Sequence, residues 1–413
     1  MASAEEIRLA HEIYATTGNK TETANLLSER LGRRIPRTTV KDWLNDAPPP
    51  SKEIPPDNTL ATLATLSHEN QILKAELARY TRQSITREAI RQEVFKLASQ
   101  PVKQPEWLTQ IGKRTGSPSN SGVPTLFCSD WHWGEVVNPN EISGFNKYDL
   151  SIAHKRVENL VTRTLSLLFD KLASPQYEGL VLVFGGDMVS GDIHEELSKT
   201  NERPIMPIVH DLDEVLVDMI EALLQRFDRI HIPCVTGNHG RTTRKMQSKE
   251  RAATNFEWIV YHRLHQWFTQ DKYGGRVTFQ IPDGADCYYK IYDHRYLLTH
   301  GDQFRGGDGL IGPLGPITRG RHKKHTRDSS LGQGFDTMLN GHFHTLMQLP
   351  HLVVNGSLIG YSEYPYVGNF EAERPAQALW LTHKTEGITF QMPVYVDDQK
   401  KKAETPWIAI PRN

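Results

Sequence analysis

Cysteine is scarce in this chain, and the few cysteines show no regular spacing. The 413 residues contain three of them, Cys128, Cys234 and Cys287, scattered among apolar neighbours. An odd, irregular set argues against a disulfide framework, and it favours buried thiols in a reducing cytoplasm. The scarcity of thiolates also argues against a structural zinc cage.

Long apolar runs and a strong net charge are also missing. No uninterrupted apolar stretch approaches the length that spans a bilayer, so no membrane partner is expected. The opening MASAEEIRLA lacks a basic segment followed by an apolar run, so we expect no signal peptide and a cytoplasmic location. The net charge of -1 gives no global signal for nucleic-acid binding, and any such signal must be local.

Residues 1–46 show the spacing of a compact all-α unit. Apolar residues recur at helical steps in the first two stretches, at Ile7, Ala10, Ile13 and Tyr14 and at Ala24, Leu27 and Leu31. Three short helices are expected, with Thr21 capping the second, breaks at Gly18, Asn19 and Gly32, and Pro36 opening the third.

The segment NKTETANLLSERLGRRIPRTTVKDWL within this unit resembles the helix-turn-helix of recombinases, transposases and phage terminase small subunits. The resemblance implies DNA binding through residues at and before the start of the third helix, namely Arg33, Arg34, Arg37, Thr38, Thr39 and Lys41. The alternative is an ordinary three-helix packing module, or one that binds protein.

Two further segments separate this unit from the rest of the chain. Residues 47–58, APPPSKEIPPDN, contain five prolines in twelve residues and are expected to be a linker. Residues 59–99 predict one long helix, or two in series. A heptad seam over 63–80 places Asn70 at a core position, where asparagine commonly fixes the register of a parallel dimer. A homodimer through this seam and a helix packed on the following domain both remain open.

In residues 122–413, short apolar runs alternate with helical patterns. The expected strands are TLFCS, LVLVFG, IHIPCVTG, YLLTHG, DTMLNG and LVVNGS, and the expected helices lie near 151–172, 210–226 and 252–269. This alternation predicts an α/β domain with a sheet covered on both faces. The tail beyond Ser357 is expected to complete the sheet, and three of its tyrosines are candidates to stack on a base: Tyr361, Tyr364 and Tyr366.

Polar residues follow most of these strands. They are Asp130, His132, Asp187, Asn238, His239, His300, His342 and His344. Because the carboxyl ends of strands in a covered sheet meet at one crevice, these side chains are expected to converge. Mixed carboxylate, amide and imidazole donors suit a pair of divalent ions, with Asp187 as a candidate bridge.

The order of these blocks is D-x-H, G-D, G-N-H, a lone histidine and G-H-x-H. It is similar to that of the calcineurin-like metallophosphoesterase superfamily, over about Thr125 to Ser357. The resemblance implies a four-layer α/β/β/α sandwich, here preceded by the small all-α unit and the long helix. It also implies two divalent ions, with Mn²⁺ favoured and Fe²⁺, Zn²⁺ or Mg²⁺ as alternatives.

By the same resemblance, Asp130, His132 and His344 would hold the first ion. Asn238, His300 and His342 would hold the second ion, and Asp187 would bridge the two. His239 would then protonate the leaving alkoxide or stabilise the transition state. The nucleophile would be a water between the ions, with its pKa lowered towards roughly 7.

The sequence departs from the family pattern in two places. Gly240 follows G-N-H, where the family commonly has an acid that orients the histidine. We expect either that Asp192 or Asp302 orients His239, or that no carboxylate does. Ser190 stands where break-repair nucleases usually have a histidine. The remaining histidines match no motif and are taken as structural or solvated: His194, His210, His231, His322 and His325.

Two basic segments bear on the substrate. One follows the G-N-H block and contains Arg241, Arg244 and Lys245; the other, TRGRHKKHTR at 318–327, contains Arg321, Lys323 and Lys324. The second lies in a glycine-rich insertion between two ligand strands, at the edge of the site. Each is either a solvated loop or a contact for substrate phosphates.

These features favour a DNA-directed nuclease with the character of a phage or prophage protein. One alternative is an enzyme of the same chemistry that acts on small nucleotides or phosphoproteins. Another is a DNA-binding regulatory or packaging protein whose phosphoesterase activity is incidental.

Overall fold

The computed structural model describes residues 2–45, 74, 104–108, 122–172, 175–305 and 312–398. The chain divides into two compact units, Met1–Ala89 and Ile90–Asn413. The expected linker at 47–58 lies outside the described residues, and so does the heptad seam at 63–80 apart from Lys74. Within the described part, no helix is both long and apolar enough to cross a membrane.

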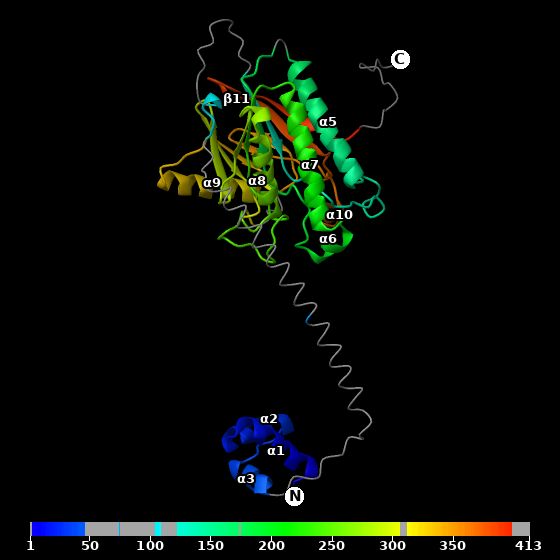
Figure 1. Ribbon diagram of the computed structural model, residues 1–413, viewed down its shortest axis with the longest axis vertical. Helices are drawn as coiled ribbons and strands as arrows, with labels where there is room; N and C mark the ends of the chain where they lie inside the picture. The colour runs from blue at the N-terminus through cyan, green and yellow to red at the C-terminus, as the bar shows by residue number, and fades with distance from the viewer. Residues whose placement is uncertain are drawn as a thin grey trace, which may run out of the picture. The chain divides into compact units, whose positions relative to one another are not determined.

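Residues 2–45 of the first unit form the helices α1 (Ala4–Thr17), α2 (Lys20–Leu31) and α3 (Arg37–Asn45) (Figure 1). Their apolar faces meet in one core, which consists of Ala10, Ala24, Leu27, Ile35, Val40 and Trp43. The spacing of apolar residues therefore buries one stripe of each helix, as an amphipathic pattern predicts.

The ends of these helices follow local backbone chemistry. Gly18 and Gly32 end α1 and α2 with φ values of 59° and 64°, the left-handed region that glycine adopts without strain. The expected cap of α2 is wrong by two residues. Asn19 is the N-cap, and its side chain accepts a hydrogen bond from the backbone N–H of Thr21 at 2.9 Å. Asparagine is the stronger capping residue of the two.

The second unit contains two mixed β-sheets. The first has the strand order β11-β10-β1-β2-β3-β4. Its strands are β1 (Val123–Cys128), β2 (Leu180–Phe184), β3 (Ile230–Pro233), β4 (Val277–Gln280), β10 (Ala376–His383) and β11 (Gly387–Tyr395). Strands β1 to β4 are parallel, and β10 joins β1 in antiparallel register. The tail of the chain thus completes the sheet, as expected.

The second sheet has the strand order β5-β6-β7-β9-β8. Its strands are β5 (Asp286–Ile291), β6 (His294–Thr299), β7 (Thr337–Asn340), β8 (Met347–Leu349) and β9 (Leu352–Val354). The six expected strands are shared between two sheets, three in each, whereas the alternation of strands and helices alone predicted a single covered sheet. Buried strands show the same continuous apolar pattern in either sheet, so the pattern did not separate them.

Helices α5 (Leu150–Phe169), α7 (Ile205–Leu224) and α8 (Phe256–Phe268) share an apolar core with the first sheet (Figure 1). A second core lies between the sheets and includes Phe127 and Val183 from the first and Leu298 and Leu339 from the second. The mixed α/β class is confirmed.

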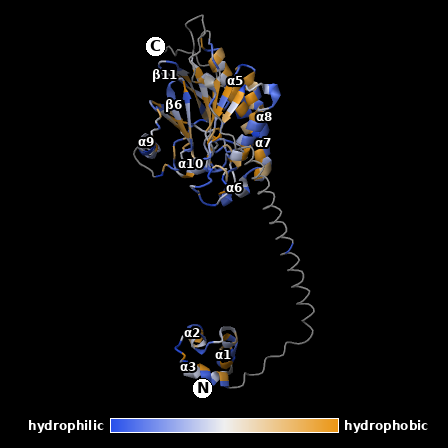
Figure 2. Ribbon diagram, turned by 60° about the vertical axis from the view of Figure 1, so that its left-hand side comes forward, coloured by the Kyte–Doolittle hydropathy of each residue, from blue (hydrophilic) through white to orange (hydrophobic). Residues whose placement is uncertain are grey.

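A third core joins Ile317 of α9 (Leu314–Ser330) to Leu297 and Met338 of the second sheet. In Figure 2, α9 is largely blue, whereas α5 and α7 carry orange, hydrophobic segments. The described residues of this unit also include the short helices η1 (Glu106–Leu108), α6 (Glu195–Thr200), η2 (Asp271–Tyr273) and α10 (Glu363–Val367).

Candidate metal centre

Both sheets send their strand ends towards one set of polar side chains. Asp130 and His132 follow β1, Asp187 follows β2, Asn238 and His239 come after β3, His300 follows β6, and His342 and His344 follow β7. The chain reverses at these ends so that each backbone brings its side chain to the shared edge, the usual place for a ligand site in an α/β domain.

Three groups of these side chains have the geometry to hold a metal ion. They are Asp130 with His132 and His344, Asp187 with His300 and His342, and His132 with Asp187 and His239. In each group the donor atoms lie within 4.8 Å of one another. Asp187 belongs to two groups, which suits a carboxylate shared by two ions.

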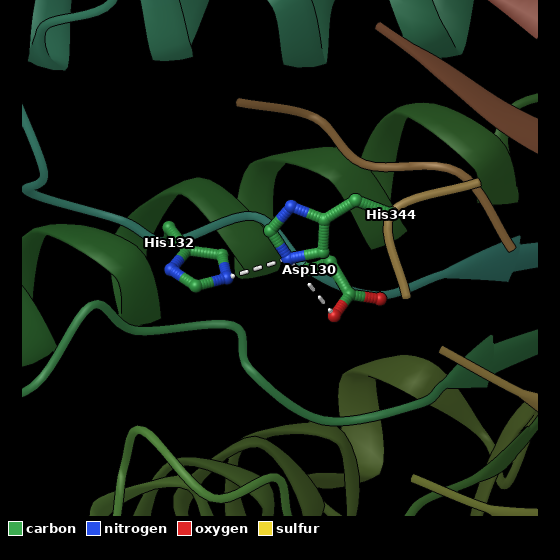
Figure 3. Close-up of side chains that lie close together, drawn as sticks. All are labelled: Asp130, His132 and His344. Carbon is green, nitrogen blue, oxygen red and sulfur yellow. Dashed lines mark hydrogen bonds and ion pairs between the residues drawn. The ribbon is translucent and has the colours of Figure 1, made fainter. Parts of the chain in front are cut away.

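The first group lies around a buried aspartate (Figure 3). His132 and His344 point towards one another with 3.1 Å between their Nε2 atoms, and His344 Nε2 lies 3.5 Å from Asp130 Oδ1. The other oxygen of Asp130 accepts from Ser129 Oγ at 2.5 Å. His132 is anchored from behind, because its Nδ1 bonds Glu135 Oε2 at 2.9 Å. A carboxylate behind a ligating imidazole fixes the ring and raises its basicity.

The second group is anchored by backbone instead. His300 Nδ1 donates to the carbonyl oxygen of Gly185 at 2.8 Å. The opposite nitrogen, Nε2, lies 2.9 Å from Asp187 Oδ2 and 3.2 Å from Asn238 Oδ1. The amide oxygen of Asn238 therefore joins this group, as the resemblance implies. The ring centroid of His342 lies 5.2 Å from that of His300.

Five of the expected ligands have a left-handed backbone. They are Asp130 at φ 56°, His132 at 49°, Asp187 at 52°, His342 at 69° and His344 at 55°. Non-glycine residues seldom adopt this conformation, which costs about 1–3 kcal/mol and gathers at functional sites. The packing around these residues therefore stabilises an unfavourable backbone conformation that directs their side chains into the site.

Buried charge is balanced inside the site. Burial raises the pKa of Asp130 to about 6. Burial alone would raise the pKa of Asp187 too, but the neighbouring His300 outweighs it and holds that pKa well below its usual range. Burial disfavours a charged imidazole, yet Asp187 raises the pKa of His300 to about 10 and Glu135 raises that of His132 to about 9. Without an ion, His132 and His300 therefore keep protons that a bound cation would displace.

His239 is oriented by a backbone carbonyl. Its Nδ1 lies 2.9 Å from the carbonyl oxygen of Ser190, which can only accept a hydrogen bond. Neither candidate acid fills this role, because Asp192 is exposed and Asp302 is engaged by both guanidinium nitrogens of Arg251 at 2.7 and 2.9 Å. Burial lowers the pKa of His239 to about 4.

Packing explains the glycine at position 240. A Cβ atom on Gly240 would lie 2.4 Å from Asn255 Oδ1 and 3.1 Å from Glu257 Cγ. The space beside the loop is thus filled by the start of α8. Any side chain at Gly240 would displace that helix end.

Glu257 is a site residue that sequence reasoning missed. It is wholly buried, and its two oxygens accept the backbone N–H groups of Met188 and Gly237, each at 2.8 Å. Those residues adjoin Asp187 and Asn238, so one carboxylate joins two ligand loops. Burial raises its pKa to about 7. Neither Glu257 nor Glu135 lies in a recognised block, and no sequence signal marks them.

The basic residues after the G-N-H block have different surroundings. Arg241 is committed to its own loop, where it donates to the carbonyl oxygens of Asn238 and Thr243 at 3.0 Å each. Arg244 and Lys245 are exposed. Only these two, within the segment, present charge to solvent beside the site.

The prediction of a glycine-rich loop at 318–327 is wrong, because this basic segment forms most of α9. Lys324 is buried and pairs with Asp286 at 2.6 Å, and Arg321 donates to the His351 carbonyl at 3.1 Å. The apolar stripe of α9 packs on the second sheet and carries Lys324 inward. Lys323 is exposed.

The residues expected to bind DNA surround the start of α3. Arg34, Arg37, Thr38 and Lys41 are exposed, and Thr39 is half-buried. Arg33 is also exposed, but it pairs with Glu6 at 2.8 Å.

The expected stacking tyrosines and unassigned histidines are dispersed. Tyr364 is 80% exposed, whereas Tyr361 and Tyr366 donate to or share hydrogen bonds with Phe370 and Ser143. His231 is buried against Thr278, and His194 adjoins His239. The other three are exposed: His210, His322 and His325.

No family model and no curated protein matches this chain. Among solved structures, a Vps29 variant from Entamoeba histolytica is 12% identical, with 65% of this chain and 98% of that chain covered and a TM-score of 0.26. A conserved protein of Streptococcus pneumoniae, described as a predicted phosphoesterase, is 10% identical over 65% and 97%, with a TM-score of 0.23. The sulfate thiohydrolase SoxB of Thermus thermophilus is 11% identical over 68% and 58%, with a TM-score of 0.27. With all three TM-scores below 0.5, any assignment of function depends on the site itself.

Proposed function

We propose that the second unit is a two-metal phosphoesterase of the calcineurin-like kind, with the four-layer α/β/β/α arrangement of that superfamily. The observation that carries the proposal is the convergence of two ligand groups, Asp130 with His132 and His344, and Asp187 with His300 and His342. Asp187 also lies within ligand distance of His132, which links the two groups. The donor set fits two divalent ions, because it combines buried carboxylates, an amide oxygen and imidazoles. The outer nitrogens of two of these imidazoles, His132 and His300, are already bonded. When bound, such ions supply a water nucleophile at neutral pH and offset charge on the phosphoryl group.

Each residue has a distinct task in this proposal. Asp130, His132 and His344 would hold the first ion, and Asn238, His300 and His342 the second, with Asp187 shared. His239 lies against the first group, with 4.4 Å between its ring centroid and that of His132. Because its Nδ1 is bonded to Ser190, its Nε2 is the atom left for the substrate.

We further propose that the substrate is a phosphodiester of DNA. Exposed Arg34, Arg37 and Lys41 at the start of α3 support DNA binding by the first unit. Exposed Arg244 and Lys245, which follow the ligand Asn238 in sequence, support contact with a polyanion by the second.

A small phosphodiester is the second candidate. The observation that favours it is the commitment of α9, because Lys324 is paired with Asp286 and Arg321 is bonded to a carbonyl. Without those cations, less positive charge surrounds the site than a long polyanion would use.

The test is hydrolysis by the purified full chain with Mn²⁺. The substrates are single-stranded DNA, duplex DNA, a bis-aryl phosphodiester and an aryl phosphomonoester, with His344→Ala as the control. Metal-dependent cleavage of DNA that His344→Ala abolishes is the expected result. Hydrolysis of the small diester alone would overturn the DNA proposal and leave the metal centre. No hydrolysis of any substrate would overturn both.

The role of the first unit is tested by DNA binding across salt concentrations. Arg37→Ala and Lys41→Ala should each weaken binding and reduce the salt slope by about 1 if they contact phosphate. Arg30→Ala is the matched control, because Arg30 is an exposed arginine of α2 that is not among the residues expected to bind DNA. Equal effects of all three substitutions would contradict DNA binding through a specific face at the start of α3.

A further inference from the structure

A histidine outside the recognised sequence blocks, His194, adjoins the candidate metal centre. His194 is the N-cap of α6, seven residues after Asp187. Its ring centroid lies 5.6 Å from that of His239, which in turn lies 4.4 Å from that of His132. His132 is buried and His194 is exposed. A chain of ring contacts therefore runs from an expected metal ligand out to solvent, the side from which a substrate arrives.

The backbone before His194 is fixed against the loop that carries His239. A Cβ atom on Gly191, whose φ is +70°, would lie 2.0 Å from the carbonyl oxygen of His239, so only glycine fits. Asn201 closes the segment, because its side chain donates to the Gly191 carbonyl at 2.7 Å and accepts from Ser190 Oγ at 2.9 Å. The proximity of the two histidines is thus built into the backbone.

The ring of His194 has no structural task among the residues that the structure describes. It makes no capping hydrogen bond to α6, although it occupies the N-cap position. The acidic groups next to it on its own element are Glu195, which pairs with Lys199, and Glu196. Among the described aromatic rings, the one that its ring contacts is that of His239, across the loop.

The bond from Ser190 limits what His239 can do. A carbonyl oxygen only accepts, so His239 holds a proton on Nδ1 against Ser190, and that nitrogen is not free to reach the substrate. Cleavage of an alkyl phosphate ester needs a proton on the leaving oxygen as the bond to phosphorus breaks. A second imidazole at the solvent side of His239 is suited to deliver it.

Building on the proposed phosphoesterase function, we propose that His194 is a further catalytic residue, which protonates the leaving oxygen of the substrate. A new P–O bond forms from water, and the P–O bond to the leaving group breaks. The leaving oxygen takes the proton of the His194 imidazolium, and the water gives up a proton that restores it. A leaving group that is stable as an anion does not need this proton.

The test compares two phosphodiesters with His194→Gln in the full chain, loaded with Mn²⁺. One is bis(4-nitrophenyl) phosphate, whose phenolate leaves without a proton; the other is a thymidine dinucleotide, whose leaving oxygen is an alkoxide. We expect kcat/KM to fall by about 10²-fold for the dinucleotide and by less than about threefold for the nitrophenyl ester, the pattern of a lost general acid.

His322→Gln is the matched control, an exposed histidine on α9. Calorimetric titration with Mn²⁺ gives a second readout, and we expect the same stoichiometry and affinity in wild type and both variants. Equal losses on the two esters, no loss on either, or weakened Mn²⁺ binding would overturn the role of His194. A wild type that cleaves neither ester would instead overturn the proposed function, and this role with it.

Discussion

The two ligand groups of the candidate metal centre are oriented by different kinds of partner. In the first, the outer nitrogen of His132 bonds the carboxylate of Glu135 at 2.9 Å. In the second, the outer nitrogen of His300 donates to the Gly185 carbonyl at 2.8 Å, and its other nitrogen pairs with Asp187 at 2.9 Å. The carboxylate that pairs with His132 lies outside the ligand set, whereas the carboxylate that pairs with His300 is itself a ligand.

The difference has consequences for metal binding. A carboxylate behind a ligand stays bonded when an ion arrives and strengthens the ligand. The histidines of both groups lose a proton to the ion, but in the second group the ion must also break a direct pair between two of its ligands, His300 and Asp187. We therefore expect the first ion to bind more tightly than the second, although the same aspartate serves both.

Replacing Asp187 should weaken both metal positions together, because both depend on this carboxylate. We expect Asp187→Asn to reduce bound Mn²⁺ from about two ions per chain to one or fewer. Activity should fall by more than about 10³-fold, since two ions supply several kcal/mol of transition-state stabilisation. Elemental analysis after dialysis measures the first effect, and phosphodiester hydrolysis the second. Asp192→Asn, an exposed aspartate of the same loop, should change neither. Two ions retained by Asp187→Asn would rule out a shared ligand.

Replacing Glu135 should separate the two positions. Glu135→Gln removes the charge behind His132 while keeping the size of the side chain. We expect the affinity of the tighter Mn²⁺ to fall by about 10–100-fold and that of the weaker ion to change little. Calorimetric titration resolves the two events. Glu141→Gln is the control, because Glu141 is exposed in the same connection. Equal weakening of both ions would show that the positions are not independently supported.

Acidity should affect the two positions over different ranges. Burial opposes the charged form of His132 and of His300. The neighbouring carboxylates nevertheless raise the pKa of His132 to about 9 and that of His300 to about 10. Below those values each ion must displace a proton, so affinity should rise about tenfold per pH unit for each proton released. The rise should stop near pH 9 for the first ion and continue towards pH 10 for the second. Titrations in buffers of different ionisation enthalpy count the protons; a constant affinity would contradict both pairings.

The convergence of the candidate ligands was predictable from the sequence because each belongs to a short block that follows a strand. Asp130, Asp187 and His300 are marked by the apolar run before them and by neighbouring glycine, serine or aspartate, all of which are local features. The mixed α/β class followed from the same alternation. The division into two sheets did not, since a buried strand has the same pattern in both.

The supports of the site were not predictable, because they join segments that are distant in sequence. Glu257 accepts the N–H of Met188, 69 residues away, and nothing near Glu257 indicates this partner. The fate of the basic insertion has the same cause. Lys324 is buried because Asp286, 38 residues before it, offsets its charge. Composition alone suggested a solvated or substrate-binding loop.

The smallest change should come from Glu257, which supports the second group through backbone alone. Glu257→Gln keeps one acceptor oxygen but turns an amide N–H₂ towards the N–H of either Met188 or Gly237. We expect a loss of about 1–3 kcal/mol in the free energy of unfolding. Mn²⁺ affinity should fall only a few-fold at the second position, because Asn255 still bonds the Gly237 carbonyl at 2.9 Å.

Acidity provides a sharper test of Glu257 in the metal-free protein. Burial raises its pKa from 4.5 to about 7, so between these values the folded chain keeps a proton that the unfolded chain releases. The contribution of Glu257 to stability is therefore present below 4.5 and is lost as the pH rises to about 7. The variant lacks this loss, so urea unfolding should show a larger cost of Glu257→Gln at about pH 5 than at about pH 8. Glu214→Gln, on the exposed face of α7, should show no such difference. A cost that is equal at both pH values would mean that Glu257 is ionised throughout, and that its negative charge supports the second group much as Glu135 supports the first.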